Sequence, residues 1–138
     1  MPEGQIGNSE VGHLNIGAGR IVYQELARIN KAIREKTLHH NKTLLNALEY
    51  AKTNQKNVHL LGLVSDGGVH SHLNHLMALC DIAEEQGIEN TYIHAFMDGR
   101  DTSPTSGKEY LTTLQHHIAT QNVQIASIIG RYLSLIHI

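Results

Sequence analysis

Residues 58–68 read VHLLGLVSDGG, an apolar run that ends in a glycine turn. The run from Val58 to Val64 is short and rich in branched side chains, which is typical of a buried strand. Ser65 to Gly68 supplies the turn chemistry that ends it. Similar runs follow at Thr91 to Met97 and at Val123 to Ile129. We therefore expect three strands in this part of the chain.

Helical patterns separate the three runs. After the first run, apolar residues recur at helical spacing until Gly87 ends the pattern, at Leu73, Leu76, Met77, Cys80 and Ala83. After the second run, Ser106 and Glu109 have the spacing of a capping box that opens another helix. This alternation predicts βαβ units, so the expected fold class is α/β with a parallel sheet. The carboxyl ends of the strands then meet at one edge, where α/β proteins bind ligands.

Two more helices are expected before the first strand. Apolar residues lie at helical spacing between Ile21 and about Lys36, with charged residues between them. Asn41 is placed to cap a second helix, whose inner face would carry Leu44, Leu45, Leu48 and Ala51.

Composition excludes several classes of protein. The 138 residues carry a formal net charge of −2 with both signs interspersed, which argues against a nucleic-acid partner. No apolar run approaches the roughly 20 residues needed to cross a bilayer, and no secretory signal opens the sequence. Cys80 is the only cysteine and cannot form an internal disulfide, which favours the reducing cytoplasm.

A candidate nucleophile lies near the start of the sequence, where residues 7–13 read GNSEVGH. Ser9 is expected at a helix N-terminus, where backbone N–H groups and the helix dipole favour an alkoxide or a phosphate ester. A serine nucleophile also needs a base or a metal ion to activate it. The competing interpretation is that Ser9 only caps a helix.

Candidate anion-binding residues follow each predicted strand: His70 after the first, Arg100 and Asp101 after the second, and Arg131 after the third. A guanidinium fork suits phosphate or carboxylate, and Asp101 could exchange a proton with a bound hydroxyl. Each residue has an ordinary alternative, namely a solvated turn, a local ion pair or a surface charge. His70, His72 and His75 could instead bind a metal, although their spacing is a weak signal. Together the loops favour a small ligand bearing a phosphate and a carboxylate.

Several of these strings resemble one enzyme family. Residues 4–20, GQIGNSEVGHLNIGAGR, are similar to the nucleophile segment of cofactor-independent phosphoglycerate mutases. Residues 64–72, VSDGGVHSH, and 97–102, MDGRDT, resemble its substrate-binding loops, in the same order and at close to the same spacing. Residues 130–132, GRY, resemble the start of a further substrate-binding segment. The resemblance covers residues 2 to 132.

The resemblance implies the interconversion of 3-phosphoglycerate and 2-phosphoglycerate in glycolysis, through a phosphoserine on Ser9. Ser9 would also be a ligand of one of two divalent metal ions, usually Mn²⁺, in a domain of the alkaline phosphatase superfamily. His70, Arg100, Asp101 and Arg131 would bind the substrate from an inserted transferase domain, with Asp101 as a proton shuttle. The complete enzyme would be a cytoplasmic monomer without a nucleic-acid or membrane partner.

The sequence also departs from the family pattern. We expect residues 1–22 to be a remnant of the phosphatase-like domain, 23–132 to be part of the transferase domain, and 133–138 to be an atypical tail. Most metal ligands and a further substrate-binding arginine are missing, so the chain alone is expected to be inactive. The alternatives are a non-catalytic module that binds phosphoglycerate or another anion, a phosphatase or phosphopentomutase of the same superfamily, and a transition-metal site formed by the histidines.

Overall fold

A computed structural model describes residues 9–137. The chain forms two compact units that divide between His40 and Asn41. The first unit holds α1 (Ser9–Ala18), α2 (Glu25–Arg34) and the 3-10 helix η1 (Leu38–His40). The second holds α3 (Lys42–Thr53), β1 (Val58–Leu63), α4 (Leu73–Glu85), β2 (Thr91–Met97), α5 (Gly107–His117), β3 (Val123–Gly130) and the 3-10 helix η2 (Arg131–Leu133).

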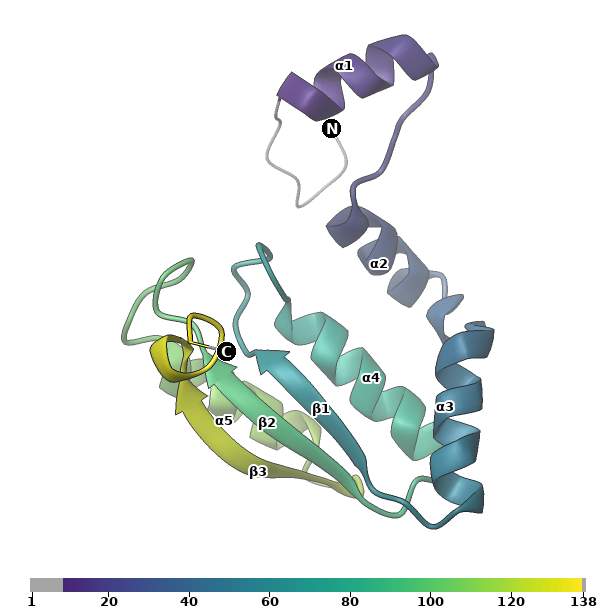
Figure 1. Cartoon of the computed structure of the whole chain (residues 1–138), viewed down its shortest axis with the longest axis vertical. Helices are drawn as coiled ribbons and strands as arrows, with labels where there is room; N and C mark the ends of the chain where they lie inside the picture. Colours follow the sequence, from purple (N-terminus) through teal and green to yellow (C-terminus); the bar gives the residue numbers. More distant parts are fainter. Residues whose placement is uncertain (1–8, 138) are drawn as a thin grey trace. The chain divides into compact units, whose positions relative to one another are not determined.

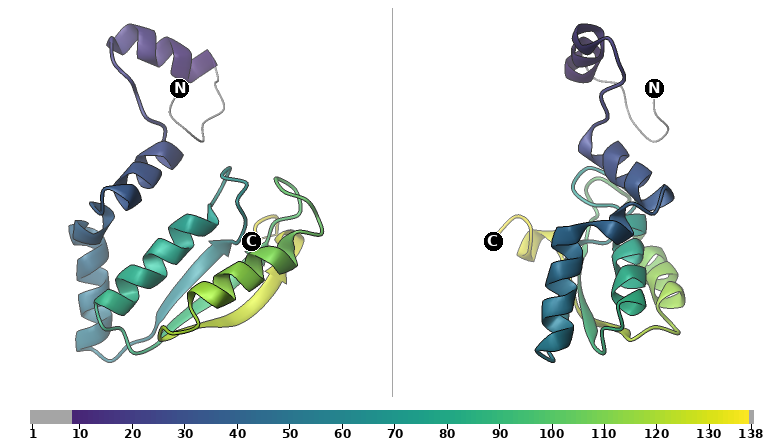
Figure 2. Two further views of the ribbon diagram at one scale, coloured as in Figure 1. Left: turned by 180° about the vertical axis from the view of Figure 1, so that it is seen from behind. Right: turned by 90° about the vertical axis from the view of Figure 1, so that its right-hand side faces the viewer.

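The second unit is built on a parallel sheet in the order β1-β2-β3, which confirms the predicted α/β class. β1 pairs with β2 in continuous register, from Val58 opposite Thr91 to Leu63 opposite Phe96. The β2–β3 register shifts between Ile93 and His94. Helices α4 and α5 lie on the same face of the sheet (Figures 1 and 2). Right-handed crossovers that add each new strand on the same side place both helices there.

The core lies between this face of the sheet and the two helices. Alternate strand residues such as Ile93 and Ala95 point into it because side chains in a strand alternate between faces. The buried cluster also contains Val64, Leu73, Cys80, Leu114, Ile118 and Val123. Burial, followed by the negative charge of Asp81, raises the pKa of the Cys80 thiol to about 12, so this cysteine packs as a small apolar residue.

Helix α2 begins later than its apolar pattern predicts. Residues 21–24 are not helical, and the Val22 N–H donates to the Asn15 side chain at 2.6 Å instead of joining a helix. The helix ends at Arg34, and Lys36 has a left-handed φ of 56°. The predicted helix between Ile21 and Lys36 is therefore confirmed only in its central part.

One of the two predicted helix caps forms. Asn41 caps α3 by accepting from the Leu44 N–H at 3.1 Å, as expected. The capping box at Ser106 was a wrong prediction, because the Ser106 side chain makes no cap hydrogen bond. Its hydroxyl donates to the Ser103 carbonyl at 2.7 Å. The physical reason is that Ser106 already has helical φ and ψ, whereas a capping residue needs an extended backbone.

The segment after β3 turns back on the strand end. The Ser134 hydroxyl donates to the Gly130 carbonyl at 3.0 Å, and Ser134 is buried. Tyr132 and His137 make an edge-to-face ring contact with centroids 4.4 Å apart.

No helix within residues 9–137 is both long and apolar enough to span a bilayer. The division of the chain at residues 22 and 132 stays a prediction.

Candidate functional site

The loops that follow β1, β2 and β3 lie at one edge of the sheet, as the βαβ pattern predicts (Figure 1). The loop after β2 approaches the loop after β1 closely. A Cβ built on Gly67 would lie 3.2 Å from the Asp101 Cβ and 3.2 Å from the Thr102 Cγ2, so a side chain here would require these neighbours to shift by a few tenths of an ångström. Tyr110 of α5 also donates its hydroxyl to Asp66. The loops therefore form one packed surface.

Asp98 is the centre of this surface. The Ser65 hydroxyl donates to its Oδ2 at 2.7 Å, which joins the end of β1 to the end of β2. Its Oδ1 accepts from the backbone N–H groups of Arg100 at 3.2 Å and Asp101 at 3.1 Å. The same oxygen accepts from Arg131 Nη1 at 2.8 Å, which adds the end of β3. A single carboxylate thus connects all three strand ends.

Arg131 is a buried cation between two carboxylates. Its Nη1 also donates to Asp101 Oδ2 at 2.7 Å. Side-chain exposure is 6% for Arg131, 3% for Asp98 and 17% for Asp101, so solvent screens this cluster weakly. The hydrogen bond to Asp101 raises the pKa of the Arg131 guanidinium; burial opposes this, and Asp98 adds to it. The guanidinium is consequently fixed in position and in charge.

The environment of Asp98 favours its ionised form. Burial alone would raise its pKa, but hydrogen bonds from the Ser65 hydroxyl, from the backbone of Asp101 and Arg100, and from Arg131 lower it to about 2. All of these donors bind the charged carboxylate better than the neutral acid.

This lowered pKa predicts a specific acid sensitivity. A carboxyl group whose pKa is lower in the folded chain stabilises the fold above its unfolded-state pKa, near 4, and loses that contribution as the pH falls through about 2. We expect the free energy of unfolding, measured by urea titration, to fall more steeply between pH 4 and pH 2 in the wild type than in Asp98→Asn. Parallel pH profiles for the two chains would contradict the assigned environment.

A hollow of about 260 Å³ lies beside Arg131. Its lining comes from the ends of β2 and β3 and from the start of α5, and includes Asp98, Thr102, Tyr110, Arg131 and Tyr132. The Arg131 Nε is buried and has no hydrogen-bond partner among the described residues. A buried donor without a partner costs free energy, so an acceptor at this position would be stabilising.

The structure brings together two of the predicted substrate-binding residues, Asp101 and Arg131. Arg100 is exposed and makes no ion pair with any residue that the structure describes; its neighbour Asp101 pairs with Arg131 instead. His70 is also exposed, on the loop after β1. Both residues are exposed on loops at the same sheet edge, and the link of Arg100 to the buried cluster is its backbone N–H, which donates to Asp98.

Ser9 is the first residue of α1 in the other unit, and its side chain is exposed. The prediction that it begins a helix is confirmed. Its Oγ lies 3.3 Å from the His13 Nδ1, which also lies 2.7 Å from the Ser9 carbonyl oxygen. Residues 4–8, the first part of the segment that resembles the family's nucleophile segment, lie outside the described residues.

Sequence reasoning missed the roles of Asp98 and Ser65. Asp98 directly follows a buried strand and precedes Gly99, whose φ is 73°. An aspartate in that context often accepts from the N–H groups two and three residues later, and this pattern was available as a signal. The partnership of Asp98 with Ser65 and Arg131 was not, because it depends on the order of strands in space.

The histidines after β1 do not form the metal site considered from the sequence. His72 caps α4 by accepting from the Asn74 N–H at 3.1 Å on its Nδ1, and its ring lies 5.5 Å from that of His75. Within residues 9–137, no three His, Cys, Asp or Glu side chains gather as a metal-binding group. Among the described residues, no such group lies beside Ser9.

Comparisons with known proteins agree on one family. A family model described as "BPG-independent PGAM N-terminus" matches residues 29–135. Proteins named 2,3-bisphosphoglycerate-independent phosphoglycerate mutase are similar to this chain: 58% identical over 135 residues in Bacteroides fragilis and 59% in Parabacteroides distasonis, in each case over 98% of this chain and 27% of the relative. A crystal structure of Leishmania mexicana phosphoglycerate mutase at low cobalt concentration matches 91% of this chain and 24% of that chain, with a TM-score of 0.74 and 32% identity. The chain thus spans about a quarter of the length of these relatives.

Proposed function

The chain belongs to the 2,3-bisphosphoglycerate-independent phosphoglycerate mutase family, and on this premise we propose that it supplies the nucleophile and part of the substrate site for interconverting 3-phosphoglycerate and 2-phosphoglycerate. The reaction belongs to glycolysis, so we place the protein in the cytoplasm, and we propose that the complete enzyme is a monomer. The chain matches 27% of the Bacteroides fragilis relative. Other parts of such an enzyme would complete the active site.

The observation that carries this proposal is the buried Arg131 at the edge where three loops meet. It has a fixed positive charge, an Nε donor without a partner among the described residues, and a hollow beside it. A phosphate or carboxylate oxygen is the acceptor that best satisfies such a donor. Arg100 and His70 are exposed at the same edge and would add donors from the other two loops.

Asp101 is the proposed proton shuttle. Its Oδ2 accepts a hydrogen bond from Arg131 at 2.7 Å. The Asp101 side chain is 17% exposed, so a substrate can reach it. A carboxylate fixed in this way can take the proton of the attacking hydroxyl in each half of the reaction and give it to the departing oxygen.

Ser9 is the proposed nucleophile. Its Oγ would attack the phosphorus of 3-phosphoglycerate while the bond to the glycerate O3 breaks, and the proton that leaves Oγ passes to the departing O3. The glycerate O2 hydroxyl would then attack the phosphoserine while its proton passes to the departing Oγ, which releases 2-phosphoglycerate and restores Ser9. The start of helix α1 favours the negative charge of the phosphoserine.

Two divalent metal ions, usually Mn²⁺, accompany this chemistry in the family, and Ser9 would be a ligand of one. The described residues do not fit such a site by themselves, since no group of three suitable side chains forms within residues 9–137. For the same reason, we propose that the chain alone does not turn over substrate.

Calorimetry combined with an assay tests these proposals. The purified chain is expected to bind 3-phosphoglycerate weakly, with a dissociation constant on the order of 1 mM, because only part of the site is present. Arg100→Ala should weaken binding severalfold, whereas the matched control Arg34→Ala, an exposed arginine of α2, should not. Mutase activity with Mn²⁺ should equal the blank. Absence of binding, or turnover that disappears in Ser9→Ala, would contradict the proposal.

The alternative function is a non-catalytic module that binds phosphoglycerate or another anion. The same buried arginine and hollow favour it, and binding without turnover is its expected result as well. The two functions differ in whether Ser9 reacts once the rest of the enzyme is supplied.

A further inference from the structure

Two histidines meet on the face of the sheet opposite α4 and α5. His59 of β1 pairs in register with Tyr92, and His94 lies two residues further along β2. Side chains two residues apart in a strand point to the same face, so the two rings are neighbours. Their centroids are 5.3 Å apart and their planes differ by 21°. The His59 Nδ1 lies 3.0 Å from the His94 Nε2.

A third residue holds the second ring in place. The other nitrogen of His94, Nδ1, lies 2.8 Å from the Ser127 Oγ of β3. If this Nδ1 carries the proton and donates it to Ser127, the lone pair of Nε2 points towards His59. A histidine that donates through one nitrogen to a fixed acceptor while the other nitrogen stays basic has the usual arrangement of a metal ligand.

We propose that His59 and His94 form a binding site for a late first-row divalent ion, Cu(II) or Ni(II). An ion about 2.0 Å from both nitrogens at their present separation of 3.0 Å would have an N–metal–N angle of roughly 97°. This angle lies between the roughly 90° of tetragonal Cu(II) or Ni(II) sites and the roughly 109° of tetrahedral zinc, and is closer to the tetragonal value. The site is independent of the proposed mutase function.

Metal binding here needs little change in protonation or structure. The ion takes the place of the proton that the two rings share, and that proton moves from Nδ1 to Nε2 of His59. His59 is exposed, so a small rotation of its ring can direct the Nδ1 lone pair to the ion. Water completes the coordination, since no third His, Cys, Asp or Glu joins the pair within residues 9–137.

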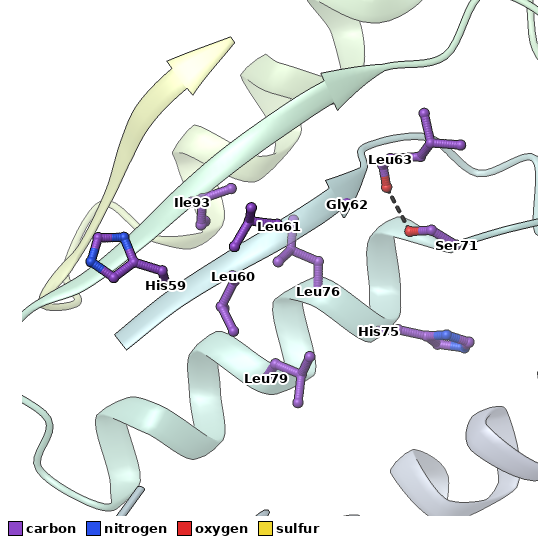
Figure 3. A pocket seen from close by; sticks show the side chains of 10 residues that line it. All are labelled: His59, Leu60, Leu61, Gly62, Leu63, Ser71, His75, Leu76, Leu79 and Ile93. Carbon is purple, nitrogen blue, oxygen red and sulfur yellow. Dashed lines mark hydrogen bonds between the residues drawn. The ribbon is translucent and has the colours of Figure 1, made fainter. Parts of the chain in front are cut away.

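A neighbouring hollow shows that His75 does not join the His59–His94 pair. A hollow of about 220 Å³ between β1 and α4 is lined by both His59 and His75. In Figure 3, His59 lies at one end of this hollow beside the strand, and His75 lies at the other end on α4. His75 is therefore not a third ligand, and the remaining lining is mostly leucine, which does not bind metal ions.

Calorimetric titration of the purified chain with CuSO₄ and with NiCl₂ tests the site. We expect one ion per chain at this site and at least tenfold weaker binding in His59→Gln and in His94→Gln. Ser127→Ala should weaken binding to a lesser degree, because it removes only the group that orients His94. The matched control His116→Gln, an exposed histidine of α5, should bind as the wild type does. Circular dichroism confirms that each variant is folded.

A second measurement locates the ion without any substitution. Substoichiometric Ni(II) should broaden the imidazole NMR signals of His59 and His94 before those of the other histidines. Equal affinities in all four variants and the wild type, or broadening that begins at other histidines, would overturn the proposal. Zn(II) binding tighter than Cu(II) would overturn the assigned geometry.

Discussion

Replacing Ser9 with alanine is expected to lower mutase turnover at least about 10³-fold once the rest of the enzyme is present, because removal of a covalent nucleophile eliminates the main reaction path. In the test, residues 2–132 of this chain replace the matching stretch of the Bacteroides fragilis relative, to which this chain is 58% identical over 135 residues. The chimera should convert 3-phosphoglycerate to 2-phosphoglycerate, measured with a coupled enolase assay.

Ser103→Ala in the same chimera is the matched control, since Ser103 is an exposed loop serine. It should retain activity close to that of the unchanged chimera. An active chimera in which Ser9→Ala and Ser103→Ala behave alike would show that Ser9 is not the nucleophile. A folded but inactive chimera that still binds 3-phosphoglycerate would instead favour the non-catalytic binding module.

Replacing Asp98 with alanine is expected to destabilise the chain by about 3 kcal/mol, because it leaves part of a buried charge uncompensated and several donors without an acceptor. The substitution removes the acceptor of the Ser65 hydroxyl, of two backbone N–H groups and of Arg131. For a unit of this size, that loss corresponds to a melting temperature roughly 12–24 °C lower. Thermal unfolding followed by far-ultraviolet circular dichroism measures it.

Asp66→Ala is the control for this substitution. Asp66 lies two residues before Gly68 on the loop after β1, is exposed, and accepts one hydrogen bond from Tyr110. We expect a cost of less than about 1 kcal/mol there. If Asp98→Ala were no more destabilising than Asp66→Ala, Asp98 would not be the residue that connects the three strand ends.

Much of the fold was predictable from local sequence. The three apolar runs became β1, β2 and β3 because each is short and bounded by turn residues, and because helical stripes separate them. Asn41 capped α3 because an asparagine side chain needs only local backbone to accept from Leu44. The parallel direction of the strands followed from the helical crossovers between them. These features depend on neighbours in sequence, so sequence alone was enough.

The parts that sequence reasoning missed depend on neighbours in space. Ser106 had the right spacing for a capping box but a backbone already turned into the helix. An ion pair between Arg100 and its neighbour Asp101 was the ordinary expectation, yet Asp101 pairs with Arg131, thirty residues away. The contact between His59 and His94 likewise requires the register of β1 against β2. Spacing in one segment cannot reveal any of these partners.

We propose that Ser9 accepts the phosphoryl group of a substrate that the strand-end loops bind. Acid-quenching the chimera during turnover of 3-phosphoglycerate and mapping phosphorylation by mass spectrometry tests it most directly. We predict a phosphate on Ser9 that is absent from the chimera incubated without substrate. Turnover without phosphate on Ser9, or with phosphate on another residue, would contradict the mechanism.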